Sequence, residues 1–107
     1  MNADPSGDRR ARQRLDAVVR GRVQGVGFRM FASRSATAHG LVGWVANESE
    51  GTVHCVAEGP RAALEAFARD LAMGPPGSVV DRIDSSWSAA TGGFDRFALR
   101  SGWHGGD

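Results

Sequence analysis

The order of apolar periodicities along the chain constrains its fold more than any other feature. Apolar residues alternate from Leu15 to Val23, as in a half-buried strand, and recur at helical spacing from Phe28 to Ala36. Two strand-like runs follow at 41–47 and 52–58, and a second helix is expected to end at Gly74. Two more strand candidates, 78–87 and 94–100, flank the loop sequence SAATGG. The buried stripe of the second helix is expected to comprise Leu64, Phe67, Ala68, Leu71 and Ala72.

Turn and cap residues lie where these segments meet. Gly40 is placed to cap the first helix, Gly51 lies in the hairpin turn ESEG, and Pro60 opens the second helix. The order is therefore strand, helix, strand, strand, helix, strand, strand. Two helices with one apolar stripe each need one sheet face to cover. This predicts an α+β fold, a ferredoxin-like two-layer sandwich with two helices on one face of a mostly antiparallel sheet, βαββαβ with an extra C-terminal strand.

A length of 107 residues indicates one domain. We expect a disordered N-terminal tail at 1–13, a domain at 14–100 and a C-terminal tail at 101–107. The first tail contains most of an arginine cluster at 9–14, for which a solvated segment is favoured over an RNA-binding arm because the run is short and charge-mixed.

Charge and composition exclude several classes of function. The formal net charge is +1, so nothing global indicates a nucleic-acid or membrane partner. No apolar run is long enough to span a bilayer, and the arginines near the N-terminus are not followed by the apolar region of a secretory signal. The single cysteine, Cys55, lies in an apolar strand and is expected to be buried and inert. We therefore expect a cytoplasmic protein.

The loop sequence QGVGF, residues 24–28, lies between the first strand and the first helix. Glycines let backbone N–H groups turn toward a ligand, and a helix N-terminus adds unpaired donors and partial positive charge. Arg29 follows directly and could clamp an oxyanion. An anion site and a tight turn beside a surface arginine both fit this spacing. The loop matches neither a Walker motif, which needs a lysine, nor a dinucleotide fingerprint.

Asn47 ends the strand before the hairpin. An asparagine there is typically a turn-former, and the alternative is a carboxamide that orients a water over the anion site. The residues alone favour the turn.

The segments GRVQGVGFR and GLVGWVANESEGTV together resemble the acylphosphatase family, and GPPGSVVDRID is similar to its bacterial members. The resemblance runs from about Leu15 to Arg100 and implies the same ferredoxin-like fold. It implies that Arg29 binds phosphate and that Asn47 positions the attacking water. It further implies a phosphate cradle and a supporting threonine, formed by Gln24, Gly25, Val26, Gly27, Phe28 and Thr52.

The activity implied is hydrolysis of the carboxyl–phosphate bond of a small-molecule acyl phosphate. The sequence gives no sign of oligomerisation, so we expect a monomer. The leaving carboxylate has a pKa near 4, so it needs little protonation and a general acid is dispensable. The resemblance therefore requires no cofactor, and no two histidines show metal-ligand spacing. Ala46 and Glu48 depart from the family pattern around Asn47, and an acid at 48 could repel an anionic substrate.

Three other functions are considered. A non-catalytic acyl- or carbamoyl-phosphate-binding module would resemble the acylphosphatase-like domain of the much longer hydrogenase-maturation proteins. An RNA-binding domain would need aromatic platforms on its central strands, which TVHCVAE and LDAVVRGRV lack. A regulatory module of this fold would have no reason to place Arg29 and Asn47 at these spacings. Two further side chains, His54 and Glu58, are expected to be exposed and solvated.

Overall fold

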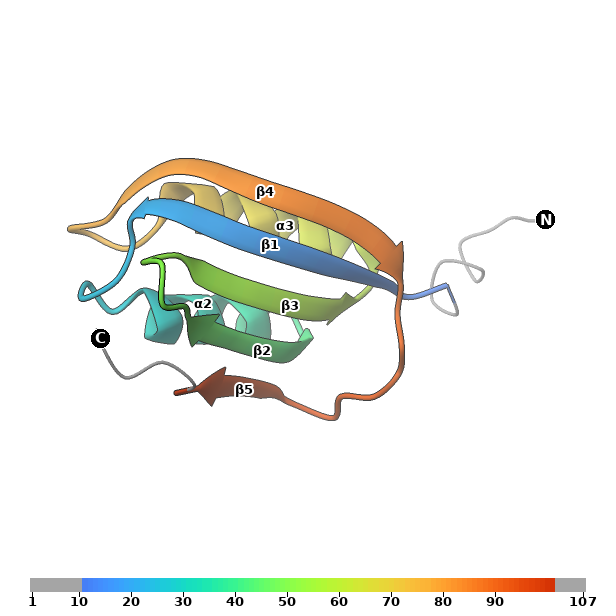
Figure 1. Ribbon diagram of the computed structural model, residues 1–107. Helices are drawn as coiled ribbons and strands as arrows, with labels where there is room; N and C mark the ends of the chain where they lie inside the picture. Colours follow the sequence, from blue (N-terminus) through green and yellow to red (C-terminus); the bar gives the residue numbers. More distant parts are fainter. Residues whose placement is uncertain (1–10, 102–107) are drawn as a thin grey trace.

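The computed structural model describes residues 11–101, and the expected order of elements is confirmed within them (Figure 1). The helices are α2 (Phe28–Ala38) and α3 (Arg61–Met73). The strands are β1 (Gln13–Arg22), β2 (Val42–Asn47), β3 (Val53–Gly59), β4 (Val79–Ala89) and β5 (Phe97–Arg100). Most of the two proposed tails, including the cluster's Arg9 and Arg10, lies outside the described residues.

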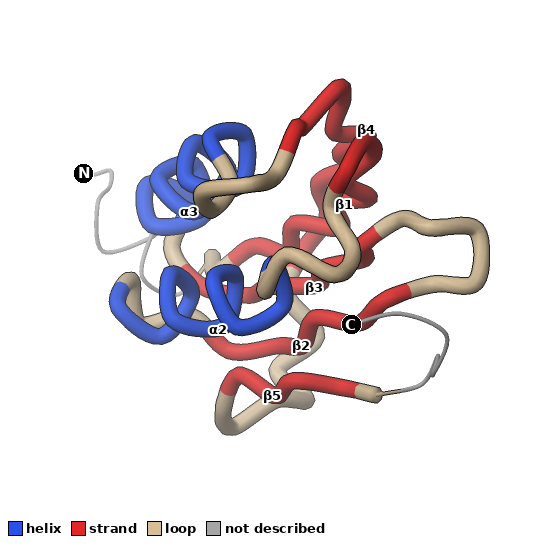
Figure 2. Tube along the Cα trace, turned by 90° about the vertical axis from the view of Figure 1, so that its left-hand side faces the viewer, coloured by secondary structure: helices blue, strands red, loops and turns tan. Residues whose placement is uncertain are grey.

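The strands form one five-stranded sheet in the order β4-β1-β3-β2-β5. β1 pairs antiparallel with β3 and β4, and β3 pairs antiparallel with β2. β5 runs parallel to β2, with Val45 opposite Leu99. Both helices cover the same face of this sheet, and the other face is open (Figures 1 and 2). The predicted ferredoxin-like sandwich with an extra C-terminal strand is confirmed. Neither helix is long and apolar enough to cross a membrane.

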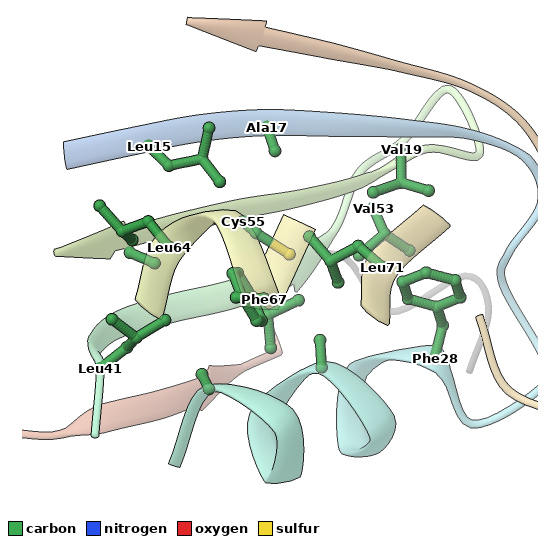
Figure 3. Packing of buried hydrophobic residues seen from close by; sticks show 14 of the residues in the cluster. Leu15, Ala17, Val19, Phe28, Leu41, Val53, Cys55, Leu64, Phe67 and Leu71 are labelled. Atoms are coloured by element: carbon green, nitrogen blue, oxygen red, sulfur yellow. The ribbon is translucent and has the colours of Figure 1, made fainter. Parts of the chain in front are cut away.

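The core lies between the sheet and the helices (Figure 3). Alternate residues of β1 point into it because side chains alternate across a strand, and fully burying one large apolar side chain is worth about 1.5–3 kcal/mol. Cys55 lies in this core as expected, and burial raises the pKa of its thiol far above the ordinary value. The largest contributions from α2 and α3 are Phe28, Leu64, Phe67 and Leu71.

The expected stripe of α3 is wrong at one position. Leu64, Phe67 and Leu71 are buried, but Ala72 is exposed. Ala72 lies about 100° around the helix from Leu71, which carries it past the edge of the sheet-facing stripe.

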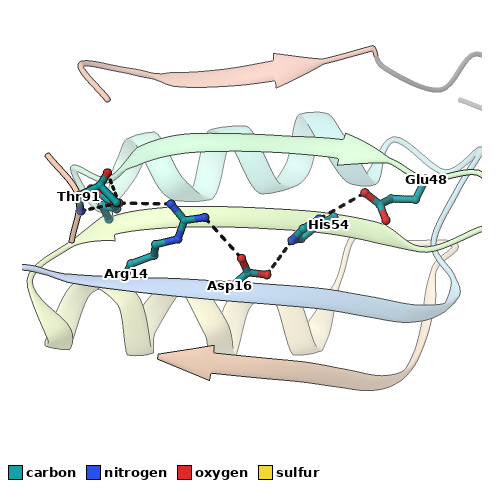
Figure 4. Close-up of polar contacts among 6 residues, drawn as sticks. Arg14, Asp16, Glu48, His54 and Thr91 are labelled. Atoms are coloured by element: carbon teal, nitrogen blue, oxygen red, sulfur yellow. Dashed lines mark hydrogen bonds and ion pairs between the residues drawn. The ribbon is translucent and has the colours of Figure 1, made fainter. Parts of the chain in front are cut away.

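The expectation of a solvated Glu58 is wrong. Its side chain is 2% exposed and accepts hydrogen bonds from the Thr91 N–H at 2.9 Å, the Thr91 hydroxyl at 2.9 Å and the Gly92 N–H at 3.1 Å. Arg14 lies 3.7 Å away (Figure 4). Burial by itself would raise the pKa of Glu58, but these donors and Arg14 outweigh it and hold the pKa below its usual value. The carboxylate therefore ties the β4–β5 connection to the sheet.

Candidate active site

The loop between β1 and α2 turns on two glycines. Gly25 and Gly27 have φ angles of 76° and 75°, in the left-handed region that favours glycine. Gly27 is the N-cap of α2, and its carbonyl accepts the Phe31 N–H at 3.0 Å. The two glycines thus allow a left-handed backbone in this loop, and a side chain at Gly27 would strain that conformation.

The N-terminus of α2 carries the electrostatics of an anion site. Gly27 has no side chain to cap the helix, and the first turn contains no acidic residue. The first N–H groups of a helix lack intrahelical acceptors, and the helix dipole places partial positive charge there. An oxyanion at this end would meet these donors directly.

Arg29, in the first turn of α2, is buried at 8% exposure. Its Nη1 donates a hydrogen bond of 2.5 Å to the carbonyl oxygen of Arg100, at the end of β5. This bond fixes the orientation of a planar, permanently charged guanidinium. A strand that is remote in sequence therefore sets the direction of this cation.

Gln24 fastens the glycine loop to the β2–β3 hairpin. Its Nε2 donates to the carbonyl oxygens of Glu48 at 2.8 Å and Thr52 at 2.9 Å, and the Glu48 N–H itself donates to the Thr52 carbonyl. The loop and the hairpin turn consequently lie at the same end of the sheet (Figure 1). Asn47, the last residue of β2, is held at this junction and is 5% exposed.

A pocket of about 220 Å³ opens at this junction. The residues that line it come from the segment after β1, which includes the glycine loop, and from the first turn of α2, β2 and β5: Val23, Gly25, Gly27, Phe28, Arg29, Met30, Asn47 and Leu99. The pocket thus brings together a buried arginine, a buried carboxamide and the two left-handed glycines.

The structure places the expected site residues in two groups. Gly25, Gly27, Phe28, Arg29 and Asn47 line the pocket. Gln24, Val26 and Thr52 do not: Gln24 bridges to the hairpin, and Val26 packs against the core.

Thr52 leaves one polar atom without a partner. Its side chain is 5% exposed, and among the described residues its Oγ1 is the one buried side-chain N or O atom with no hydrogen bond. A buried hydroxyl normally has a hydrogen-bond partner. The Thr52 hydroxyl, next to the hairpin turn, could therefore bond to a group that binds there.

Sequence reasoning missed three lining residues, Val23, Met30 and Leu99. Met30 and Leu99 are 50% and 40% exposed, although both are large and apolar. Met30 follows Arg29 and could have been suspected. Leu99 gave no signal, because its place depends on the parallel pairing of β5 with β2.

Glu48, which follows Asn47, does not line this pocket. It lines a more open hollow on the other side of Asn47, together with Trp44 and Arg100. Within residues 11–101 no group of three His, Cys, Asp or Glu side chains is placed to hold a metal ion.

Comparison with known proteins identifies the family of the chain. The acylphosphatase family model matches residues 15–99. The chain is 44% identical to an acylphosphatase of Salinibacter ruber over 88 residues, which is 82% of this chain and 93% of that protein. It is 43% identical to an acylphosphatase of Bacillus subtilis over 82 residues, 77% of this chain and 90% of that protein.

Solved structures give the same result. The crystal structure of acylphosphatase from Bacillus subtilis superposes with a TM-score of 0.80 at 40% identity, covering 82% of this chain and 98% of that one. Full-length HypF in its phosphate- and nucleotide-bound form gives 0.76 at 33% identity, but the match covers only 12% of that longer chain. Because the family model covers most of the chain and its relatives match over nearly their whole length, the chain belongs to the acylphosphatase family.

Proposed function

We propose that this chain hydrolyses the carboxyl–phosphate bond of acyl phosphates in the pocket between the glycine loop, α2 and β2. Arg29 and the N–H groups of the 24–28 loop would bind the phosphoryl oxygens, and Asn47 would orient the attacking water. The observation that carries this proposal is that Arg29 and Asn47, from separate elements, line one pocket together with Gly25 and Gly27.

The chemistry demands little of the side chains. The oxygen of the water forms a bond to phosphorus while the bond from phosphorus to the acyl oxygen breaks, and the carboxylate leaves with the electron pair. One proton of the water stays on the attacking oxygen, and the other passes to a phosphoryl oxygen of the substrate itself. What remains is to position the reactants and to stabilise charge on the phosphoryl oxygens, as in phosphoryl transfer generally.

The lip of the pocket fits a phosphate joined to an organic acid. Met30 and Leu99 expose apolar surface beside the polar floor. An inorganic anion alone would gain nothing from this surface, whereas an acyl group next to the phosphate could cover it. The pocket therefore suits a mixed anhydride of phosphate and a carboxylic acid.

Gln24 and Thr52 would act through Asn47 in this proposal. Gln24 holds the loop and the hairpin together by its two bonds to the Glu48 and Thr52 carbonyls. The unpartnered Thr52 Oγ1 could complete the polar surroundings of the Asn47 carboxamide when substrate and water are bound. Both are positioning residues.

The test is hydrolysis of benzoyl phosphate by the wild type and Arg29→Ala in the presence of a chelator. We expect chelator-resistant turnover by the wild type, and a loss of about a thousandfold in kcat/KM in the variant because the phosphoryl charge loses its main partner. Arg20→Ala is the matched control, since Arg20 pairs with Asp84 on the exposed surface. An Arg29→Ala protein as active as the wild type would disprove the assignment of this pocket.

The alternative is a binding module without turnover, for which the likeness to HypF is the relevant observation. A folded wild type that binds inorganic phosphate but leaves benzoyl phosphate intact would support it. The relatives that match over nearly their whole length are acylphosphatases, which favours the catalytic function.

We further propose that the protein acts as a cytoplasmic monomer. The near-neutral net charge of +1 also disfavours a nucleic-acid or membrane partner, because it offers no general attraction to nucleic acid or to anionic lipid. Sedimentation of the full chain at several concentrations would test the monomer, with a concentration-dependent mass as the contrary result.

A further inference from the structure

Glu48 presents an electrostatic problem at the proposed site. It directly follows Asn47, and its carboxylate carries the same sign of charge as the substrate phosphate. A like charge near a bound anion weakens binding, most strongly at low ionic strength. The direction in which this side chain is held therefore matters for catalysis.

The structure holds Glu48 on the open face of the sheet (Figure 4). Its Oε2 lies 3.3 Å from Nδ1 of His54, on β3. Nε2 of the same ring lies 2.7 Å from Oδ1 of Asp16, on β1. His54 was expected to be exposed, but it is only 22% exposed and lies between two carboxylates.

Further contacts fix the ring in this position. The Trp44 ring packs edge-on against His54, with centroids 4.9 Å apart. Arg14 lies 3.6 Å from Asp16, and the guanidinium carbon of Arg100 lies over the Trp44 ring, 4.4 Å from its centroid. The imidazole is thus held from β1 and β2 and points one nitrogen at Glu48.

We propose that His54 is a positioning residue that holds the Glu48 carboxylate away from the phosphate pocket; this rests on the function proposed above. Asp16 lies at hydrogen-bond distance from Nε2 and orients the ring, which places Nδ1 3.3 Å from the Glu48 carboxylate. The chain thereby tolerates an acid next to Asn47.

Two substitutions separate the two ends of the ring. In His54→Asn the amide nitrogen takes the place of Nδ1 and can still donate to Glu48. In His54→Gln the longer amide takes the place of Nε2, so it reaches Asp16 and leaves Glu48 unbound. Both remove the ionisable ring, and they differ in which carboxylate keeps a donor.

Kinetics with benzoyl phosphate at low salt test the proposal. We expect His54→Gln to raise KM about three- to tenfold with little change in kcat, and the rise to shrink at high salt, because a freed carboxylate repels the anion. His54→Asn should stay close to the wild type. The inhibition constant of inorganic phosphate should change in parallel with KM.

Removing the Glu48 carboxylate tests whether His54 acts through Glu48. Glu48→Ser should cancel the effect of His54→Gln, so the two substitutions are strongly non-additive. Glu50→Ser is the matched control from the same turn: Glu50 has no bond to His54 among the described contacts, so its effect should be the same in both backgrounds. Equal KM values for His54→Gln and the wild type, or a rise that persists with Glu48→Ser, would overturn the proposal.

The failure of the proposed function gives a different pattern, since no variant would then turn over benzoyl phosphate. In that case calorimetry with inorganic phosphate replaces KM. Weaker binding in His54→Gln alone, restored by Glu48→Ser, would still support the role of His54, and equal affinities would reject it.

Discussion

The two ends of the sheet gather backbone N–H groups and an arginine in similar ways. In the described part of the chain, the Glu58 carboxylate lies among them at one end, the filled end, whereas a pocket lies beside them at the other, the open end. At the β4–β5 connection, N–H groups of Thr91 and Gly92 and the nearby Arg14 surround the buried carboxylate of Glu58. At the opposite end, the N-terminus of α2 and Arg29 line a pocket. The first turn of α2 contains no acidic residue. A buried carboxylate of the chain stabilises the fold through such donors, whereas a pocket beside them can admit an anion.

The open end needs support of a different kind. The first N–H groups of α2 have no acceptor within the helix, so other groups hold the glycine loop in place. Gln24 bonds the glycine loop to the hairpin, and the Arg100 carbonyl orients Arg29. At the filled end, Glu58 itself links β3 to the β4–β5 connection through its bonds to Thr91 and Gly92.

After the thousandfold loss expected for Arg29→Ala, the next largest effect should come from removing Asn47, the proposed water-orienting residue at the open end. Asn47→Ala is expected to lower kcat for benzoyl phosphate about a hundredfold, because one preorganised polar partner of the reaction is lost. The affinity for inorganic phosphate, measured by calorimetry, should change much less. Ser49→Ala, in the exposed turn, serves as the control. A weakening of phosphate binding as large as the loss in kcat would place Asn47 in phosphate binding instead.

Removing the anion at the filled end should reduce stability and leave chemistry intact. Glu58→Ala is expected to cost about 2–3 kcal/mol in the free energy of unfolding, because buried N–H donors lose a charged acceptor. Denaturant unfolding measures this, and kcat of the folded fraction should stay unchanged. Added formate should restore part of the stability by entering the vacated site. Glu65→Ala, which breaks an exposed pair with Arg61, is the control expected to cost little.

One glycine at each end allows a matched comparison. Gly27 and Gly92 have φ angles of 75° and 76°, and a Cβ added at either would meet no atom within 4 Å. Alanine should therefore cost about 1–2 kcal/mol of stability at both positions through the backbone alone. Only Gly27→Ala should also raise KM, since only Gly27 lines the pocket. An equal rise in KM for Gly92→Ala would show that the two ends are coupled.

The smallest effect concerns pH. The folded-state pKa of Glu58 lies below its ordinary value of 4.5, so its contribution to stability is present above that value and is lost as pH falls through the folded-state pKa. The difference in unfolding free energy between the wild type and Glu58→Gln should accordingly shrink as the pH falls below 4.5. A difference that stays constant down to the acid transition would mean that the Glu58 charge contributes nothing.

The sequence by itself determined the types and the order of the elements. The alternation of β1, the stripes of α2 and α3 and the glycine loop are local patterns, and each follows from the period of the chain segment that carries it. Arg29 and Asn47 could be singled out because they stand beside these local signals in a family motif. Their roles stay predictions that kinetics will test.

The tertiary structure alone decided which distant groups meet. The Arg100 carbonyl reaches Arg29, and Leu99 reaches the pocket, because β5 pairs in parallel with β2 across more than fifty residues of sequence. Glu58 is buried because a remote loop folds over it. Strand pairing and loop closure depend on contacts between segments that are far apart in the sequence. The apolar periodicity of a single segment therefore could not predict them.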